Sequence, residues 1–285
     1  MLEAGPGTWE MAEEAANLLA AEDPLDLRDD DGNSFAWPIE AVRLRSPLPR
    51  PPSLRAFYAF EQHVRAAFAL RRQPIPPEWY EAPVFYFSNA QSILGPGEAV
   101  AAPAGSRALD FELEVAAIVG RRSRDLAVGE AEQAIFGFTV MNDWSARDLQ
   151  RVEMRVGLGP AKGKDFATSL GPCIVTPVEL ASHHAGRPGV YDLVMRARVN
   201  GTVRSQGIWK DVHFSFGDML ASASADADLI PGDVLGSGTV GTGCLLELTG
   251  GEGPWLQPGD LVELEIEAIG VLANRVAERV KPGRL

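Results

Sequence analysis

Carboxylates spaced two residues apart are the first feature of this sequence that could do chemistry. Asp110, Glu112 and Glu114 alternate with apolar residues. Alternate residues of a β-strand point to the same face, so a strand here would bring three acidic side chains together. Like charges on one face repel each other unless water solvates them or a cation bridges them. The segment therefore predicts either a solvated polar face or a metal site.

A further carboxylate, Asp143, favours the metal site. The hydrophobic segment 136–141 predicts a strand that ends at Asn142 and Asp143, and Ser145 is expected to cap a helix that follows. A carboxylate at such a junction can reach the acidic side chains of a neighbouring strand. Three carboxylates without a paired His or Cys suit a hard ion, with Mg²⁺ expected before Ca²⁺ or Mn²⁺, and with water or substrate oxygens completing its coordination.

The helix expected after Asp143 carries a polar stripe. Asp143, Arg147, Gln150 and Met154 are spaced at i, i+4, i+7 and i+11, which places them on one helical face. If this face points toward the carboxylates, its cation and amide would lie next to a bound ion.

The segment 143–168 is locally cationic. It contains five Lys or Arg residues and four Asp or Glu residues, whereas the whole chain has a net charge of −13. Such a segment could hold an anionic substrate that the rest of the protein repels. Arg151 and Arg155 are expected to form salt bridges on the helix surface. Lys164 lies in a Gly-Lys loop and is the better candidate for function.

The first 50 residues differ from the remainder. A helix is expected over 10–21, an acidic turn over 29–33 and a strand of alternating polarity over 41–45. The proline-rich segment 47–52 then stiffens the chain and cannot form a central strand. We therefore predict a small N-terminal domain over 1–50 and a catalytic domain over 51–285.

The larger segment alternates short strands with a few helices. Strands are expected over 84–88, 111–119, 137–141, 173–177, 191–199 and 261–268, and helices over 61–72, 129–135, 145–154 and 216–223. Asn200 and Gly201 have the signature of a tight hairpin. Because strands outnumber helices and hairpins dominate, we predict a β-rich α+β fold, a mixed β-sandwich or β-roll, and not a doubly wound sheet.

The composition excludes several classes of protein. Hydrophobic residues make up 46% and charged residues 23%, as in ordinary globular proteins. The acidic balance argues against nucleic-acid binding. Neither a membrane span nor a secretory signal is expected, so we place the protein in the cytoplasm. Its two cysteines, Cys173 and Cys244, are expected to be reduced thiols.

From about residue 50 to residue 270 the sequence resembles the fumarylacetoacetate hydrolase family. The motifs that carry the resemblance lie at 109–114, 142–150, 158–160, 163–168 and 238–241. The most specific is the run Asn-Asp-Trp-Ser-Ala-Arg-Asp, which starts 28 residues after Glu114. The resemblance implies that Glu112, Glu114 and Asp143 bind a divalent metal, that the fold is the mixed β-roll of the family's C-terminal domain, and that the protein is a homodimer.

The resemblance also implies catalytic roles. The segment 55–63 is similar to the family segment that bears the catalytic histidine, which makes His63 the general base and Glu247 the carboxylate that orients it. Residues that stabilise developing charge would be Arg147, Gln150 and Lys164. Substrate contacts would come from Tyr58, Arg72, Gln150, Met154 and Thr239. The resemblance also implies that Lys164 and Thr168 belong to the metal-binding residues.

Two positions depart from the family pattern. Ala56 stands where the fumarylacetoacetate hydrolases have a fourth, aspartate ligand, and Met154 stands where they have a tyrosine that touches substrate. Other branches of the family use three carboxylates, so Ala56 is compatible with a metal. It weakens the case for fumarylacetoacetate itself as the substrate.

The leading hypothesis is a hydrolase that cleaves a carbon–carbon bond in a small anionic diketo acid, fumarylacetoacetate-like or acylpyruvate-like, as in the catabolism of aromatic compounds. Such a reaction needs an activated water, a polarised carbonyl and stabilisation of the departing enolate. One alternative uses the same metal site to isomerise or decarboxylate a 2-hydroxy-dienedioate or an oxaloacetate-like acid. Another is a metal-stabilised scaffold without catalysis.

Overall fold

The computed structural model describes residues 6–20, 28–34 and 36–279, and the chain divides into two compact units, Met1–Leu44 and Arg45–Leu285. The sequence places the boundary slightly later, after residue 50. In the first unit α1 (Pro6–Ala20) contains the helix predicted over 10–21, except residue 21, which lies outside the described residues. The acidic turn lies between Arg28 and Ser34, which form a single antiparallel bridge.

The strand predicted over 41–45 is wrong. The chain forms a short 3₁₀ helix, η2 (Ile39–Ala41), and then continues without a ladder partner among the described residues. Apolar side chains on this segment, Val42 and Leu44, are exposed. Alternating polarity alone does not make a strand, because a strand is stabilised by pairing with another.

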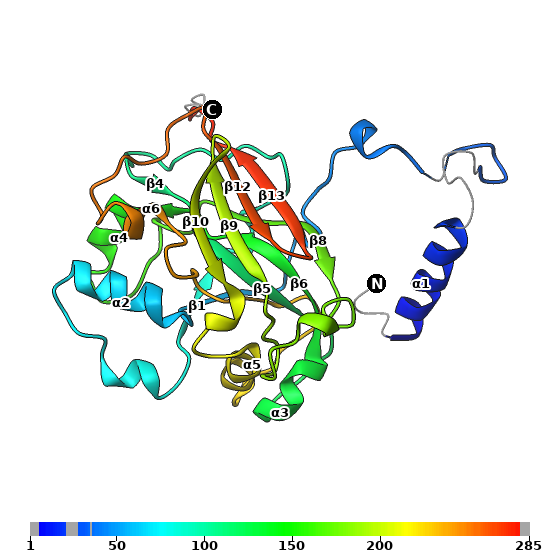
Figure 1. Cartoon of the computed structure of the whole chain (residues 1–285), viewed down its shortest axis with the longest axis horizontal. Helices are drawn as coiled ribbons and strands as arrows, with labels where there is room; N and C mark the ends of the chain where they lie inside the picture. Colours follow the sequence, from blue (N-terminus) through cyan, green and yellow to red (C-terminus); the bar gives the residue numbers. More distant parts are fainter. Residues whose placement is uncertain (1–5, 21–27, 35, 280–285) are drawn as a thin grey trace. The chain divides into compact units, whose positions relative to one another are not determined.

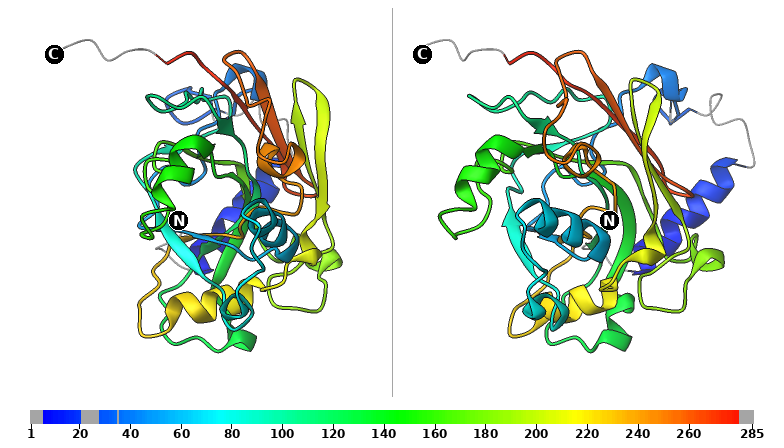
Figure 2. Two further views of the ribbon diagram at one scale, coloured as in Figure 1. Left: turned by 90° about the vertical axis from the view of Figure 1, so that its left-hand side faces the viewer. Right: turned by 60° about the vertical axis from the view of Figure 1, so that its left-hand side comes forward.

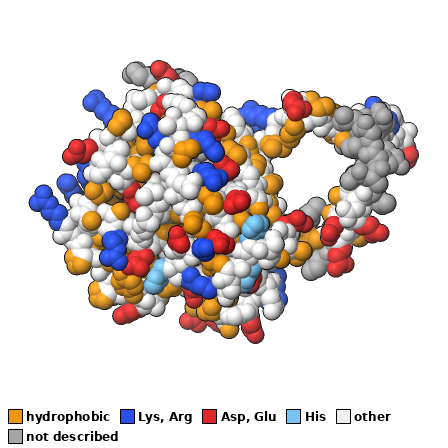
Figure 3. Space-filling view, in the orientation of Figure 1, with side chains coloured by type: hydrophobic (Ala, Val, Ile, Leu, Met, Phe, Trp, Pro, Cys, Tyr) orange, Lys and Arg blue, Asp and Glu red, His pale blue; other side chains and the backbone are white. Residues whose placement is uncertain are grey.

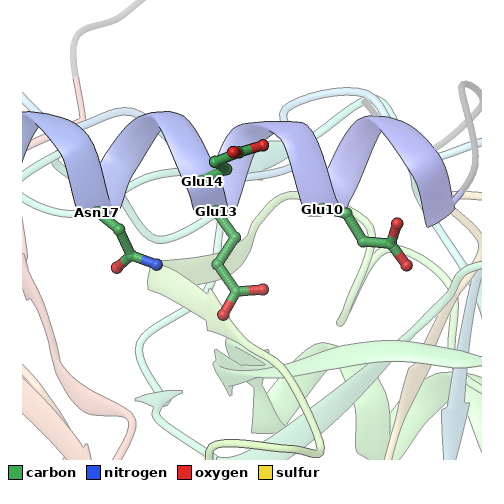
Figure 4. A pocket seen from close by; sticks show the side chains of 4 residues that line it. All are labelled: Glu10, Glu13, Glu14 and Asn17. Atoms are coloured by element: carbon green, nitrogen blue, oxygen red, sulfur yellow. The ribbon is translucent and has the colours of Figure 1, made fainter.

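An acidic face lies on α1. Glu10, Glu13, Glu14 and Asn17 line a hollow beside this helix (Figure 4), and all four are exposed. Their spacing of three and four residues places them on one side of the helix. Exposed carboxylates on a helix are solvated without a ligand, so we assign no site to this face.

A mixed seven-stranded sheet is the centre of the second unit (Figure 1). Its strands, in spatial order, are β2 (Phe85–Ser88), β1 (Leu54–Phe57), β11 (Val234–Gly236), β5 (Leu113–Val119), β6 (Ile135–Asn142), β8 (Thr168–Val175) and β3 (Ile93–Leu94). The pairs β1–β11 and β3–β8 are parallel, and the others are antiparallel. Both faces of β5 are buried, which explains why its sequence is nearly all apolar beyond Glu114.

A four-stranded antiparallel sheet packs against β6 and β8 (Figures 1 and 2). Its order is β10 (Thr202–Ile208), β9 (Val194–Val199), β12 (Leu261–Ile266) and β13 (Gly270–Arg275). The predicted hairpin at Asn200 and Gly201 is confirmed, and both residues adopt positive φ as that turn requires. Alternate residues of β9 and β12 are buried, so the core lies between the two sheets. The predicted β-rich α+β class is confirmed.

The second unit also contains a small third sheet and several short helices. The third sheet pairs β4 (Leu109–Asp110) with β7 (Ser145–Ala146). The α-helices are α2 (Glu61–Leu70), α3 (Val128–Ala131), α4 (Arg147–Glu153), α5 (Phe216–Ser224) and α6 (Leu245–Leu248). Short 3₁₀ helices are η3 (Pro77–Tyr80), η4 (Glu132–Ala134), η5 (Ala181–His183) and η6 (Trp209–Asp211). None of the described helices is long and apolar enough to cross a membrane.

The third sheet corrects two predictions. The strand expected over 111–119 begins only at Leu113, because residues 111–112 leave the ladder between β4 and β5. Ser145 does not cap a helix, because it pairs with Asp110 in β7, and α4 begins two residues later, at Arg147. The chain thus leaves regular strand structure at residues 111–112 and again at residues 143–144. Glu112 and Asp143 lie at these two breaks.

Candidate active site

A cavity of about 400 Å³ opens among β1, α2, β2, β5 and the segment that follows β6. Most of the residues that the sequence singled out line this cavity: Tyr58, His63, Glu112, Glu114, Asp143, Arg147, Gln150, Met154, Lys164 and Thr239. Ala56 lines it as well. Arg72, Thr168 and Glu247 are not among the lining residues of the described chain. The fold therefore brings together segments that are almost 200 residues apart.

Three carboxylates meet in this cavity. Each of Glu112, Glu114 and Asp143 offers an oxygen within 4.8 Å of the other two. They are 5%, 1% and 1% exposed, so water does not solvate them as a polar face. The pairing of β5 with β6 explains the meeting, because Leu113 lies opposite Asn142 in the ladder and the acidic residues flank this pair.

Two cations balance part of this charge. Lys164 Nζ donates to Glu112 Oε2 at 2.5 Å and to Asp143 Oδ2 at 2.8 Å, and Arg147 Nη1 lies 2.8 Å from Glu112 Oε1. Burial alone would raise the pKa of Glu112, but the two cations lower it to about 2. An ammonium has no lone pair, so Lys164 holds the predicted ligands and does not itself bind the metal.

The other two carboxylates are balanced less well. Burial, Asp143 and Glu112 raise the pKa of Glu114 well above its usual value. Burial and Glu112 also raise the pKa of Asp143, against the opposing effect of Lys164. Asp143 Oδ1 is buried and has no hydrogen-bond partner. A bare buried oxygen and three clustered carboxylates are the donor set of a hard divalent cation, so these residues fit the metal that the resemblance implies.

Glycines make room for Glu114. The Gly238 N–H donates to Glu114 Oε2 at 3.0 Å, and the φ of Gly238 is +82°. A Cβ there would lie 2.6 Å from the carbonyl oxygen of Phe57. A Cβ on Gly236 would lie 3.0 Å from Glu114 Oε2 itself. Gly236, at the end of β11, and Gly238, just after it, therefore let the backbone approach the carboxylate of Glu114 closely.

His63 and Glu247 form a buried pair at the cavity wall. His63 Nδ1 lies 2.5 Å from Glu247 Oε1, although 184 residues separate them. The second carboxylate oxygen, Oε2, accepts from Thr242 N at 3.0 Å. Since Nδ1 faces Glu247, Nε2 remains for the cavity that His63 lines. Glu247 lies behind the imidazole, as expected of a group that orients it.

Asp110 is not part of the carboxylate cluster that the sequence predicts. It accepts from Arg147 Nε at 2.8 Å and from the backbone N–H groups of Leu245 and Leu246 at 2.8 and 3.0 Å. These are free amides at the start of α6, whose own N-cap residue makes no side-chain cap. Asp110 therefore ties Arg147 to the helix that carries Glu247.

Tyr86 is a site residue that the sequence analysis missed. Its hydroxyl donates to Asp143 Oδ2 at 2.5 Å and the residue lines the cavity. In the antiparallel pairing of β1 with β2, Tyr86 lies directly opposite Ala56, the position of the missing fourth ligand. The sequence predicts the strand but not its partner, so no local signal points to Tyr86.

The remaining site predictions fare differently. Gln150 Oε1 accepts from Arg147 Nη1 at 3.1 Å, so arginine orients the amide. Asp143 precedes α4 and is not on its helical stripe, but it faces the same cavity as Arg147. Arg72 follows α2 with a left-handed φ of 57°, and its neighbour Arg71 lines the cavity in its place. Thr168 begins β8 and is buried there.

The chain is similar to several known proteins. The family model for the fumarylacetoacetate hydrolase C-terminal domain matches residues 53–277. A rice fumarylacetoacetase is 29% identical over 81% of this chain, which spans 65% of that relative. A human mitochondrial oxaloacetate tautomerase is 31% identical over 96% of this chain and 78% of the relative.

Solved structures show the same fold. A 5-carboxymethyl-2-hydroxymuconate delta-isomerase from Mycobacterium smegmatis matches with a TM-score of 0.67 and 31% identity, over 87% of each chain. A fumarylacetoacetate hydrolase from Exiguobacterium antarcticum matches with a TM-score of 0.64 and 31% identity, over 84% of this chain and 79% of the other. The relatives thus carry names of hydrolases, tautomerases and isomerases.

The first prediction concerns Glu114. Because its charge is unfavourable in the empty cluster, Glu114→Gln should leave the free energy of unfolding in chelator unchanged or higher. The variant should bind Mg²⁺ at least about 100-fold more weakly, since even partners of metal ligands contribute 10–100-fold. Mg²⁺ should then raise the Tm of the wild type and leave that of the variant almost unchanged. Asp192→Asn, which removes a surface carboxylate paired with Lys210, is the control. An equal Mg²⁺-induced shift in Glu114→Gln would contradict the assignment.

The second prediction concerns Asp110. Asp110→Asn should lower the free energy of unfolding by about 3 kcal/mol, because it breaks a buried ion pair with Arg147 and weakens the cap of α6. The loss should be the same with Mg²⁺ and with chelator, since Asp110 does not bind the ion. Chemical denaturation under both conditions measures it. A loss confined to the Mg²⁺-loaded protein would instead make Asp110 a metal ligand.

Proposed function

This chain belongs to the fumarylacetoacetate hydrolase family, and we propose that it is a divalent-metal-dependent hydrolase. Its substrate would be a small diketo acid, acylpyruvate-like or fumarylacetoacetate-like, in which it cleaves a carbon–carbon bond. The observation that carries the proposal is the buried pair of His63 and Glu247 at the wall of the carboxylate cavity. A base held in this way can activate water beside a bound dicarbonyl.

The carboxylates Glu112, Glu114 and Asp143 would hold the ion. When bound, a divalent ion supplies Lewis-acid polarisation of the substrate's oxygens. Lys164 keeps Glu112 and Asp143 in place through its two ion pairs. Tyr86 fixes Asp143 through its hydroxyl, which leaves the other oxygen of Asp143 without a protein partner. The chain's own contribution is thus a rigid, preorganised set of oxygens.

His63 would begin the reaction by taking a proton from water at Nε2. Glu247 accepts the hydrogen bond of Nδ1–H, which fixes the tautomer and stabilises the imidazolium that forms. The water oxygen attacks one carbonyl carbon of the 1,3-dicarbonyl, and the bond from that carbon to the central carbon then breaks. The electron pair of the bond passes to an enolate, which takes the proton back from His63. The products are a carboxylic acid and a ketone.

Gln150 is placed to stabilise the developing charge. Its amide oxygen is bound to Arg147, so the NH₂ group remains as a donor toward the cavity that it lines. A donor that is already oriented needs no rearrangement as charge builds up on the oxygen. Arg147 is fixed in turn by Asp110 and Glu112.

A second candidate function uses the same site for a reaction that does not consume water. Tautomerisation, isomerisation or decarboxylation needs a metal that chelates an α-keto acid and a base, but no hydrolytic water. Ala56 favours this reading, because the carboxylate found there in the fumarylacetoacetate hydrolases is absent. The names of the human oxaloacetate tautomerase and the mycobacterial isomerase point the same way.

The third prediction separates these candidates. His63→Ala should lower kcat for hydrolysis by about 10²–10⁴-fold, the usual contribution of a general base, with substrate and metal affinity nearly unchanged. Glu247→Gln should cost less, because it orients the base and does not take the proton. The double variant should be little worse than His63→Ala, as expected of residues that act as a unit.

The assay follows products from a panel of acylpyruvates and oxaloacetate, with Mg²⁺ or Mn²⁺ and with a chelated control. His183→Ala is the matched variant, since His183 lies in η5 and does not line the cavity. Full hydrolytic turnover in His63→Ala would overturn the assigned base. Tautomerisation without any cleavage in the wild type would favour the second candidate.

A further inference from the structure

A second cavity adjoins the candidate active site. It has a volume of about 520 Å³ and lies among α2, α4 and α6. Six residues line both cavities: Ala67, Arg71, Arg147, Gln150, Met154 and Leu246. We call the second cavity the annex; the residues that only it contains include Leu70, Gln73, Arg151 and Arg155. A ligand in the candidate active site could therefore extend into the annex.

The annex is cationic. Arg71, Arg151 and Arg155 line it, together with the buried Arg147, and no Asp or Glu does. In Figure 3, Lys and Arg side chains stand out along the edge of the molecule where α2 and α4 lie. This local excess of positive charge is unusual in a chain with a net charge of −13.

These arginines are not paired as the sequence predicts. Within the described residues, Arg71, Arg151 and Arg155 make no ion pair, so the surface salt bridges expected of the last two are absent. The acidic side chains of α4 are occupied elsewhere. Asp148 accepts from Ser106 and from the backbone of Arg107, and Glu153 accepts three backbone N–H groups of the segment 161–163.

Some exposed arginines elsewhere in the chain do form ion pairs, for example Arg122 with Asp228 at 2.7 Å. What distinguishes Arg71, Arg151 and Arg155 is that all three line one cavity. Guanidinium groups bind carboxylates in a fork geometry, and several around one hollow attract an anion strongly. Three arginines around a single cavity make no ion pair within the described residues, although Arg71 also lies over the Phe68 ring. Their arrangement around one cavity points to an anionic ligand.

Three of the six residues that line both cavities are apolar. These three, Ala67, Met154 and Leu246, come from three different segments. A hydrocarbon spacer would lie against these side chains, with a charged group beyond it. Met154, one of the departures from the family pattern, thus lies where the candidate active site and the annex adjoin.

We propose that the annex binds a second carboxylate of the substrate, so that the protein selects dicarboxylic acids with an apolar spacer. Arg151 and Arg155, which line only the annex, are the specificity-determining residues, and Arg71 lines both cavities. The identity of the substrate's reacting group, which would lie in the candidate active site, rests on the function proposed above. The charge preference does not, because it concerns binding and not turnover.

The test uses two unreactive probes, 2-oxoadipate and 2-oxohexanoate. They share an α-keto acid head and differ in a terminal carboxylate, and neither is a 1,3-dicarbonyl. Calorimetric titration of the Mg²⁺-loaded protein should give at least about tenfold tighter binding of the dicarboxylate, since charge-assisted hydrogen bonds contribute more than neutral ones. Arg151→Gln and Arg155→Gln should each weaken the binding of 2-oxoadipate by about threefold to tenfold, with little effect on the binding of 2-oxohexanoate.

Arg204→Gln is the matched control. Arg204 is exposed on β10, outside both cavities, and its replacement changes the net charge equally. Affinity for 2-oxoadipate should be unchanged in this variant and should fall with added salt in the wild type. Equal affinities for the two probes, or equal losses in all three variants, would overturn the annex. If the protein binds 2-oxoadipate more tightly than 2-oxohexanoate but hydrolyses no diketo acid, the carboxylate site in the annex would be supported and the proposed hydrolase would be refuted.

Discussion

The site depends on a buried charge imbalance. The three clustered carboxylates, Glu112, Glu114 and Asp143, are buried together with two cations, Lys164 and Arg147, and with Asp110, which pairs with Arg147 on the side away from the cluster. In their ordinary charge states they leave two negative charges without a counterpart. An uncompensated charge costs several kcal/mol in a protein interior, even after relaxation. The single divalent cation proposed above would balance these two charges.

The surrounding fold holds this cluster together. The ladder between β5 and β6 brings the acidic segments side by side, and in the short pairing of β4 with β7 Asp110 faces α6 and not the three clustered carboxylates. The glycine-rich segment after β11 lets backbone reach Glu114. α2 and α6 contact each other and carry the two members of the His63–Glu247 pair. Glu112 and Asp143 lie directly next to the ends of paired strands, which suits a site that needs fixed geometry.

The sequence predicted local features better than pairings. The carboxylate spacing, most strands and the hairpin at Asn200 follow from periodicity and turn chemistry, which are properties of neighbouring residues. The partner of Ser145 and the contact of Tyr86 with Asp143 depend on which strands pair, and no local pattern encodes that choice. Arg151 shows the same limit. Helix spacing predicts where its side chain points, but not whether a nearby carboxylate is available to form a salt bridge with it.

The most direct test is a crystal structure of the protein soaked in Mn²⁺, with anomalous diffraction recorded at the manganese edge. The account predicts one strong peak per chain, coordinated by oxygens of Glu112, Glu114 and Asp143, with Lys164 beside the ligands and not bound to the ion. A map without a peak among these carboxylates would contradict it. So would a peak at the other group of possible ligands, His63, Cys244 and Glu247, because the histidine could not then serve as a base.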